Sequence, residues 1–485
     1  MLKKIRTALA VLFLIGITVL LLDITGALNA WLGWMAKIQF LPAVLALNVA
    51  VVAALVLLTL VFGRLYCSVI CPLGIFQDVV SHIGGKAHKF RFSYKKENRW
   101  LRYGVLAAFI ILLVAGASQI AALIAPYSAY GRIVTNLFAP ISSDIVESRL
   151  FYAGEHAPKS LPTLIVAAVT LVLIVILAWK GGRTWCNNIC PVGTILGLVS
   201  RFAIFRPVFD LSKCNGCKLC SRNCKSSCID PVNHKIDYSR CVVCFDCIGT
   251  CRKGAISYKP FFAAKPATQQ EEAKPAEGAT SRRNFLAVAA MVASAATLEA
   301  QEKQVEGSLA ILERKKAPVR AVPIHPAGSE SLRHFSQHCT ACQLCVTSCP
   351  NKVLRPSVKF DRLMQPEMSF ELGYCRPECT TCSQVCPAGA IKPVTPVDKS
   401  SIQIGHAVWI QDNCVVVTDK VSCGNCARHC PAGAIRMVAV EEGSKLKVPS
   451  VNAERCIGCG SCEYHCPARP VSAIHVEGNE VHRVI

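Results

Sequence analysis

The chain has 485 residues, with 53 Lys and Arg against 31 Asp and Glu, so its formal net charge is +22. Hydrophobic residues make up 52% and charged residues 17%, which excludes a largely disordered chain. The length excludes a small disulfide-stapled domain, and the odd count of 29 cysteines excludes complete pairing within one chain. The spacing of the cysteines must therefore show what they do.

Four apolar runs in the first 180 residues predict a membrane bundle, because a helix needs about 20 apolar residues to cross the hydrocarbon core. The runs are Ala8–Leu22, Ala43–Phe62, Val105–Ile124 and Leu161–Trp179. Lys and Arg gather at the N-terminus and between the second and third runs, which places both ends of the bundle in the cytoplasm. The positive charge therefore indicates membrane topology, and no nucleic-acid partner is expected.

An internal repeat follows the second and fourth runs. Its pattern, G-R-x-aromatic-C-x-x-I-C-P-x-G, occurs at residues 63–74 and again at 182–193. Two units in the same orientation predict a pseudo-two-fold axis along the membrane normal, which would bring four thiols together. They are Cys67, Cys71, Cys186 and Cys190. Four thiolates suit a metal or a seventh iron–sulfur cluster, while redox-active dithiols and buried free thiols are the alternatives.

Two cysteine motifs after the bundle have the spacing C-x2-C-x2-C-x3-C of a two-cluster ferredoxin. In such proteins three closely spaced thiolates bind one 4Fe–4S cluster, and the fourth cysteine binds the neighbouring cluster. The predicted ligand sets are Cys214, Cys217, Cys220 and Cys251, and Cys241, Cys244, Cys247 and Cys224. Cys228 is surplus, and it could replace Cys224 as the remote ligand.

Four further motifs, each a cysteine triplet followed by a fourth cysteine and a proline, occupy the C-terminal region. They lie at residues 339–349, 375–386, 414–430 and 456–466. Structural zinc uses a single set of four ligands with a longer gap between pairs, so the compact triplets indicate 4Fe–4S clusters. Six clusters and the membrane quartet then account for every one of the 29 cysteines except Cys228.

The segment between the two cysteine-rich regions resembles an export signal. Residues 261–280 have the composition of a flexible linker. Arg282 and Arg283 then precede an apolar run, as in twin-arginine signals, so residues 281–298 are interpreted as a fifth, signal-anchor-like segment. A polar connector over 299–330 follows. The alternative is a buried helix with a chance arginine pair.

These motifs together resemble two known families. Residues 1–260 resemble the NapH family of membrane quinol dehydrogenase components, through the two C-x3-C-P pairs and the two-cluster ferredoxin. Residues 281–485 resemble the NapG family of exported four-cluster ferredoxins, so the chain resembles a fusion of the two. In the four-cluster family the first motif shares ligands with the fourth, and the second with the third. The sets implied are Cys339, Cys342, Cys345 and Cys466; Cys456, Cys459, Cys462 and Cys349; Cys375, Cys379, Cys382 and Cys430; and Cys414, Cys423, Cys426 and Cys386.

The predicted fold is a membrane α-helical bundle of four spans over 1–205, with two ferredoxin-like α+β iron–sulfur domains at 206–260 and 331–485. The resemblance implies an inner-membrane protein that takes electrons from the quinone pool and delivers them to a periplasmic reductase, often a molybdenum enzyme. Residues 206–280 would be cytoplasmic and 299–485 periplasmic. The alternatives are a metal-site maturation or regulatory ferredoxin, and a conduit whose clusters are all cytoplasmic.

Overall fold

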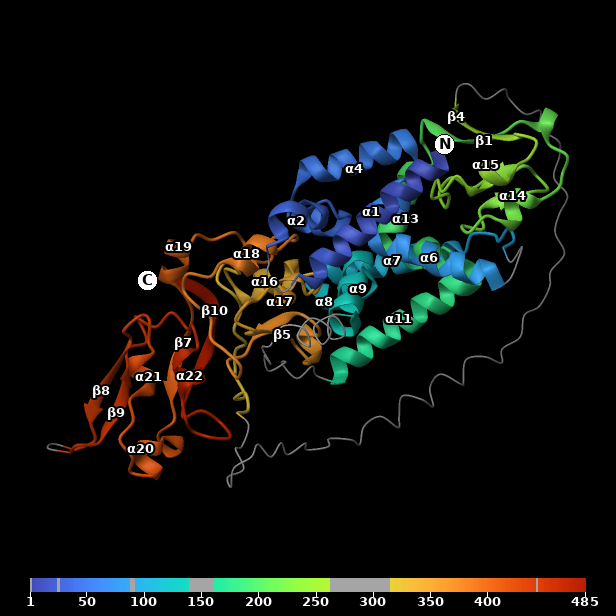
Figure 1. Ribbon diagram of the computed structural model, residues 1–485. Helices are drawn as coiled ribbons and strands as arrows, with labels where there is room; N and C mark the ends of the chain where they lie inside the picture. Colours follow the sequence, from blue (N-terminus) through green and yellow to red (C-terminus); the bar gives the residue numbers. More distant parts are fainter. Residues whose placement is uncertain (1, 24–26, 88–91, 139–160, 262–314, 442–443) are drawn as a thin grey trace.

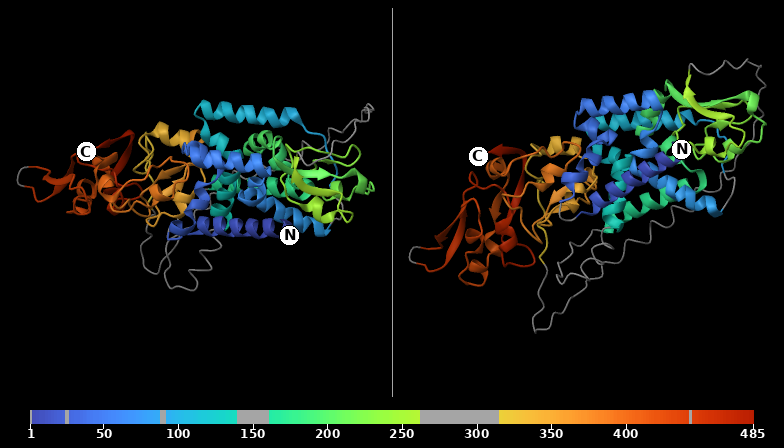
Figure 2. Two further views of the ribbon diagram at one scale, coloured as in Figure 1. Left: turned by 90° about the horizontal axis from the view of Figure 1, so that it is seen from above. Right: turned by 45° about the horizontal axis from the view of Figure 1, so that its top comes forward.

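The computed structural model describes residues 2–23, 27–87, 92–138, 161–261, 315–441 and 444–485. The predicted twin-arginine segment, nearly all of the linker and the first half of the connector lie outside the described residues. A helical bundle forms the middle of the molecule, with a small α+β domain at one end and the C-terminal α+β domain at the other (Figures 1 and 2).

Two helices of the bundle are long and apolar enough to cross a membrane. They are α1 (Leu2–Leu22) and α11 (Leu161–Gly181), of 21 residues each, and they contain the first and fourth predicted runs. Only 28% and 22% of the residues in their most apolar stretches are buried. Such extensive apolar surface is rare on proteins surrounded by water, so it suits contact with lipid.

The other two predicted spans are each divided into two helices, so the structure does not show all four predicted spans as continuous helices. Residues 43–62 divide into α3 (Phe40–Leu45) and α4 (Val49–Phe62), because Leu47 has a φ of 53° and the Asn48 side chain caps the new helix at the amide of Val51. Residues 105–124 divide into α7 (Arg99–Val114) and α8 (Ser118–Ile124), with Gly116 between them at a φ of 80°.

Shorter helices fill the centre of the bundle. They are α2 (Asn29–Lys37), α5 (Tyr66–Val69), α6 (Pro72–Ala87), α9 (Pro126–Ile133), the π-helix η1 (Val134–Phe138), α12 (Thr184–Asn188) and α13 (Pro191–Ser200). The prolines of the two C-P pairs begin α6 and α13, where a helix needs no backbone N–H. The packing of α11 on α6 and α9, and of α1 on α5, α6 and η1, buries this centre.

The first α+β domain is a ferredoxin-like unit. Its elements are β1 (Phe205–Phe209), η2 (Leu211–Lys213), α14 (Leu219–Arg222), β2 (Ile229–Asp230), β3 (Lys235–Ile236), α15 (Asp246–Thr250) and β4 (Ile256–Pro260). The outer strands β1 and β4 pair antiparallel, with Pro207 opposite Tyr258, and the hairpin β2–β3 lies between the two cysteine motifs. An ion pair of 2.8 Å between Lys3 and Asp246 joins this unit to the start of α1.

The C-terminal domain is also built from small two-stranded sheets and short helices. Its strands are β5 (Leu354–Pro356), β6 (Pro366–Met368), β7 (Ile402–Trp409), β8 (Ile435–Ala439), β9 (Lys447–Val451) and β10 (Ile474–Val484). Its helices are α16 (Leu332–His338), α17 (Leu344–Thr347), η5 (Phe360–Arg362), α18 (Thr381–Val385), α19 (Pro396–Ser401), η6 (Gln411–Asn413), α20 (Val415–Thr418), α21 (Asn425–Arg428) and α22 (Ser461–His465). The pairs are β5–β6, β7–β10 and β8–β9, all antiparallel.

Candidate iron–sulfur sites

The two copies of the repeat hold one another through their arginines. Arg64 donates from Nη2 to the carbonyl oxygen of Cys186 at 3.3 Å. Arg183 makes the reciprocal bond, from Nη1 to the carbonyl oxygen of Cys67 at 2.7 Å. The two copies of the repeat are therefore joined by equivalent, reciprocal hydrogen bonds.

The last glycine of each copy makes room for this exchange. A Cβ on Gly74 would come within 2.5 Å of Nη1 of Arg183, and a Cβ on Gly193 would come within 2.8 Å of Nη2 of Arg64. Each added carbon would also meet the carbonyl oxygen that receives the hydrogen bond, at 2.3 Å. The glycines and arginines of the pattern therefore form one structural unit.

The four thiols of the repeat meet in the buried centre of the bundle, as the repeat predicts. They are 3–4% exposed, and each lies close enough to the others for their charges to interact: Cys67, Cys71, Cys186 and Cys190. N–H groups point at the sulfurs. Gln77 donates to Cys186 Sγ at 3.2 Å, and the amide of Gly193 donates to Cys190 Sγ at 3.4 Å. Such donors are typical of ligated thiolates.

The buried charge of Arg64 indicates what kind of group the four thiols can bind. Its side chain is fully buried, and it bonds to Asn187 Oδ1 at 2.9 Å and to the carbonyl oxygen of Ser239 at 3.0 Å. Within the described residues it has no carboxylate partner, although a buried charge needs a counter-charge. Four thiolates around an iron–sulfur core carry net negative charge, so the residues present fit such a cluster.

Asp78 anchors the second arginine of the repeat. Its carboxylate pairs with Arg183 at 2.7 Å, Arg6 at 3.0 Å and Lys225 at 3.0 Å. Burial alone would raise the pKa of Asp78, but these three cations hold it well below its usual range. Lys225 also pairs with Asp246 at 3.1 Å, so one network joins the repeat, α1 and the first ferredoxin unit. Asp78 is not among the residues predicted from the sequence, although its position as an acidic residue in an apolar helix was the available signal.

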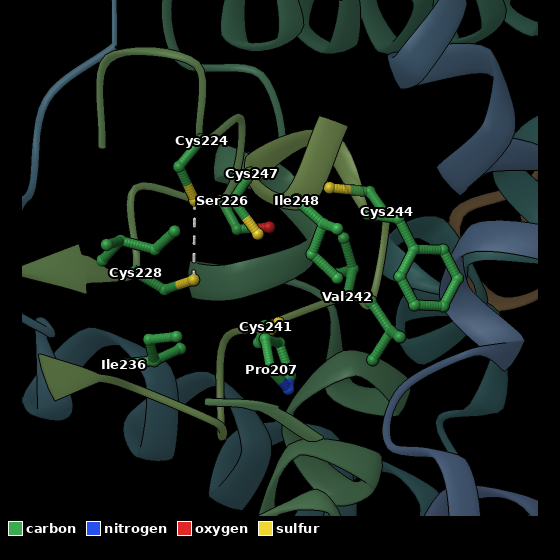
Figure 3. Close-up of a pocket in the computed structure, with 13 residues that line it drawn as sticks. Pro207, Cys224, Ser226, Cys228, Ile236, Cys241, Val242, Cys244, Cys247 and Ile248 are labelled. Carbon is green, nitrogen blue, oxygen red and sulfur yellow. Dashed lines mark hydrogen bonds between the residues drawn. The ribbon is translucent and has the colours of Figure 1, made fainter. Parts of the chain in front are cut away.

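In the first ferredoxin unit, the structure brings together the thiols that the motif spacing predicts. Cys214, Cys217, Cys220 and Cys251 line one cavity. The second cavity is lined by Cys224, Cys228, Cys241, Cys244 and Cys247 (Figure 3). The sulfurs of Cys224 and Cys228 are 3.6 Å apart, so both face this cavity and either can serve as its fourth ligand.

The C-terminal thiols meet in sets that contradict those implied by the NapG resemblance. Cys386, rather than Cys466, lines the cavity of the first triplet, and Cys430, rather than Cys349, lines that of the last triplet. Cys349 instead faces the second triplet, and Cys466 faces the third. The observed sets are Cys339, Cys342, Cys345 and Cys386; Cys375, Cys379, Cys382 and Cys349; Cys414, Cys423, Cys426 and Cys466; and Cys456, Cys459, Cys462 and Cys430.

The strand pairing gives the physical reason for this correction. In the first ferredoxin unit, β1 and β4 pair around both motifs, with the hairpin β2–β3 between them. In the C-terminal domain, β7 and β10 enclose the third and fourth motifs in the same way, with the hairpin β8–β9 between them. Consecutive motifs therefore share ligands, since closing a short local loop costs less entropy than joining motifs far apart in the sequence.

The four C-terminal sets follow one another away from the bundle. The first and second are neighbours, since the thiols of Cys345 and Cys382 are close enough for their charges to interact. The second meets the set of the last triplet where the amide of Cys375 donates to the carbonyl oxygen of Cys459 at 2.9 Å. The first set, on α17, lies beside the bundle, while the third set, on α20 and α21, lies at the far tip (Figure 1).

Two family models match parts of the chain. One, described as a 4Fe-4S binding domain, matches residues 44–91 and 162–211, which contain the two copies of the repeat. The other, described as a 4Fe-4S dicluster domain, matches residues 421–469. The second match spans parts of the third and fourth motifs, so it agrees with the pairing of consecutive motifs in the structure.

Known proteins resemble up to half of the chain. The ferredoxin-type protein NapH of Escherichia coli is 28% identical over 222 residues, which are 44% of this chain and 67% of NapH. The putative electron transport protein YccM of Escherichia coli is 25% identical over 240 residues, 48% of this chain and 60% of YccM. An uncharacterized protein of Methanocaldococcus jannaschii is 25% identical over 246 residues, 50% of this chain and 82% of that protein. No solved structure is significantly similar. The chain is therefore a ferredoxin-type 4Fe–4S electron-transport protein related to NapH.

Proposed function

We propose that the chain is a membrane-anchored electron carrier that links quinol oxidation to a periplasmic reductase, with six 4Fe–4S clusters in its two ferredoxin regions. The observation that carries the proposal is the position of these regions at opposite ends of the bundle (Figures 1 and 2). Helix α1 contacts both, through the Lys3–Asp246 ion pair at its start and through packing against α17. Its 21 residues extend about 32 Å, close to the roughly 30 Å of a hydrocarbon core.

The charge at the start of α1 supports the orientation. Lys3, Lys4 and Arg6 lie at the end that carries the first ferredoxin unit, and positive residues favour the cytoplasmic side. The C-terminal domain then lies on the periplasmic side, as the twin-arginine segment predicts. This arrangement supports the electron carrier over a conduit whose clusters are all cytoplasmic.

The four thiols of the repeat would provide an intermediate electron-transfer site between the two ferredoxin regions. Iron–sulfur clusters supply one-electron transfer, at potentials set by burial and by hydrogen bonds to sulfur. A seventh cluster on the quartet would reduce the distance that electrons must cross, and the buried Arg64 would balance its charge. Beyond it, the Phe76 and Tyr130 rings, with centroids 6.2 Å apart, fill the bundle toward α9. Oxidation of one quinol releases two electrons and two protons, so two one-electron sites must each accept an electron.

Reduction by quinol tests the proposed function. Purified full-length protein in detergent, mixed anaerobically with a reduced naphthoquinol, should show bleaching of the iron–sulfur absorbance at a rate proportional to quinol concentration. A Cys186→Ala variant lacks one quartet ligand but keeps both ferredoxin regions, so its C-terminal clusters should be reduced more slowly. Absence of bleaching with quinols of several potentials would contradict the quinol-linked function.

The topology needs its own experiment. In intact spheroplasts, an added protease should cleave within the domain that follows residue 330 and leave residues 206–260 intact. Permeabilised spheroplasts, in which both regions are accessible, provide the control. Protection of the C-terminal domain in intact cells would favour the all-cytoplasmic conduit.

A further inference from the structure

The C-terminal domain docks on the bundle through the loop that carries its first cysteine triplet. A Cβ on Gly131 of α9 would lie 2.5 Å from the carbonyl oxygen of Cys342, so this backbone lies directly against the helix. Next to it, Gln343 Oε1 accepts hydrogen bonds from Thr135 at 2.9 Å and from Asn136 at 2.7 Å. Helix α9 and the π-helix η1 of the bundle therefore contact the cysteine loop itself.

Tyr127 lies on the same face of α9, one turn before Gly131. Its side chain is 2% exposed, and its hydroxyl has no hydrogen-bond partner among the described residues. The Tyr127 hydroxyl is close enough to the thiols of Cys342 and Cys386 for the charges of these groups to interact. A buried hydroxyl without a partner is costly, so a group that the protein chain itself does not supply is expected to accept its hydrogen bond.

Tyr130 provides a contrast within the same helix. It is 5% exposed, but its hydroxyl lies 2.6 Å from the hydroxyl of Thr18 on α1. Burial in this part of the bundle therefore does not by itself leave a tyrosine hydroxyl unpartnered. The distinguishing feature of Tyr127 is its place on the face of α9 that lies against the Cys342 backbone, one turn before Gly131.

We infer that Tyr127 Oη donates a hydrogen bond to a sulfur of the 4Fe–4S cluster bound by Cys339, Cys342, Cys345 and Cys386, so that the membrane bundle sets the reduction potential of the first cluster in the docked domain. The inference deepens the proposed function and rests on the cluster assigned there. A hydrogen bond to sulfur stabilises the more negative, reduced state and so raises the potential. The potential of this site would therefore depend on the contact between the domain and α9.

Redox titration of the full-length protein, poised with chemical mediators and followed by EPR, tests the inference without quinol. Cys342→Ala identifies the signal of this cluster. In Tyr127→Phe, which removes only the hydroxyl, that signal should titrate at a lower potential. A tenfold change in its reduction equilibrium, a shift of about 59 mV for one electron, is the expected upper size. Tyr130→Phe is the matched control and should leave the potential in place.

Four results would contradict parts of this scheme separately. An unchanged potential in Tyr127→Phe would overturn the hydrogen bond, and an equal shift in Tyr130→Phe would attribute the effect to general packing. If Cys342→Ala removed no signal, the cluster itself would be absent and the proposed function would fail with it. A lowered potential in Tyr127→Phe together with no reduction by quinol would support the tuning role and refute only the quinol reaction.

Discussion

The guanidinium of Arg183 donates a hydrogen bond of 2.7 Å to the carbonyl oxygen of Cys67, a residue 116 positions earlier in the chain. Because the Arg64–Cys186 bond repeats the arrangement in reverse, each copy of the repeat fixes the cysteine loop of the other. Neither copy can form the four-thiol centre alone. The centre thus depends on both copies of the repeat.

Replacing Arg64 by Met should empty the thiol quartet. The substitution keeps much of the side-chain volume but removes the buried cation that balances the thiolates, and leaves Asn187 Oδ1 without its donor. The iron content should fall by about four atoms per chain, the content of one cubane. Iron and sulfide analysis of the purified protein measures this loss. Arg201→Met, at a side chain that is 44% exposed, should change neither value.

Replacing Asp78 by Asn should destabilise the bundle strongly. The change leaves Arg183, Arg6 and Lys225 without the carboxylate that they share. Breaking a buried pair on one side costs about 3–5 kcal/mol. Denaturant unfolding in detergent, followed by tryptophan fluorescence, measures the change. Asp210→Asn removes a surface carboxylate beside Lys213 and should have no measurable effect. A loss below about 1 kcal/mol, as for exposed pairs, would show that the network is not buried in solution.

The C-terminal domain should lose stability between neutral pH and pH 5, before most carboxylates titrate. Burial, with the charges of His482 and Arg362, lowers the pKa of His325 to about 3, and burial lowers that of His482 to about 4. Both rings titrate near 6.5 when unfolded, so the unfolded state binds more protons at pH 5 and stability falls as pH falls.

Each of these two histidines should contribute a loss of about 2 kcal/mol at pH 5. Thermal unfolding of the full-length protein at pH 7.5 and pH 5 gives the measurement. His325→Gln should reduce the difference between the two pH values, because Gln does not titrate. His406→Gln, at a partly exposed ring that contacts Asn479, should not reduce it. An unchanged difference in His325→Gln would mean that other groups cause the acid sensitivity. Acid loss of the clusters affects all the variants alike.

The sequence predicted the parts of the molecule that are encoded locally. Cysteine spacing predicted the two cavities of the first ferredoxin unit, and the repeat predicted the meeting of Cys67 with Cys186. Hydropathy could not show the helix breaks, because Leu47 and Gly116 interrupt apolar runs through backbone conformation rather than polarity. The carboxylate network also escaped prediction, since Asp78 gains its partners only when three distant segments pack together.

The NapG resemblance and the structure assign the C-terminal cysteines to different clusters, and this difference can be tested. The structure assigns Cys386 to the cluster of Cys342, and Cys466 to the cluster of Cys426, whereas the resemblance assigns Cys466 to the cluster of Cys342. Each cysteine can be replaced by alanine in turn, and the lost EPR signals compared. Cys386→Ala and Cys342→Ala should remove the same signal, because they truncate one ligand set.

Cys466→Ala and Cys426→Ala should together remove a different signal, which belongs to the tip of the domain. If Cys466→Ala instead removed the Cys342 signal, the first and fourth motifs would share ligands, and the docked arrangement of the domain would be wrong. This outcome would also separate Cys386 from the site beside Tyr127. The first cluster would then need a ligand from the segment that follows β9, whereas the structure pairs that segment with the third motif through β7 and β10. The shared loss of a signal thus tests the fold of the domain as well as its ligands.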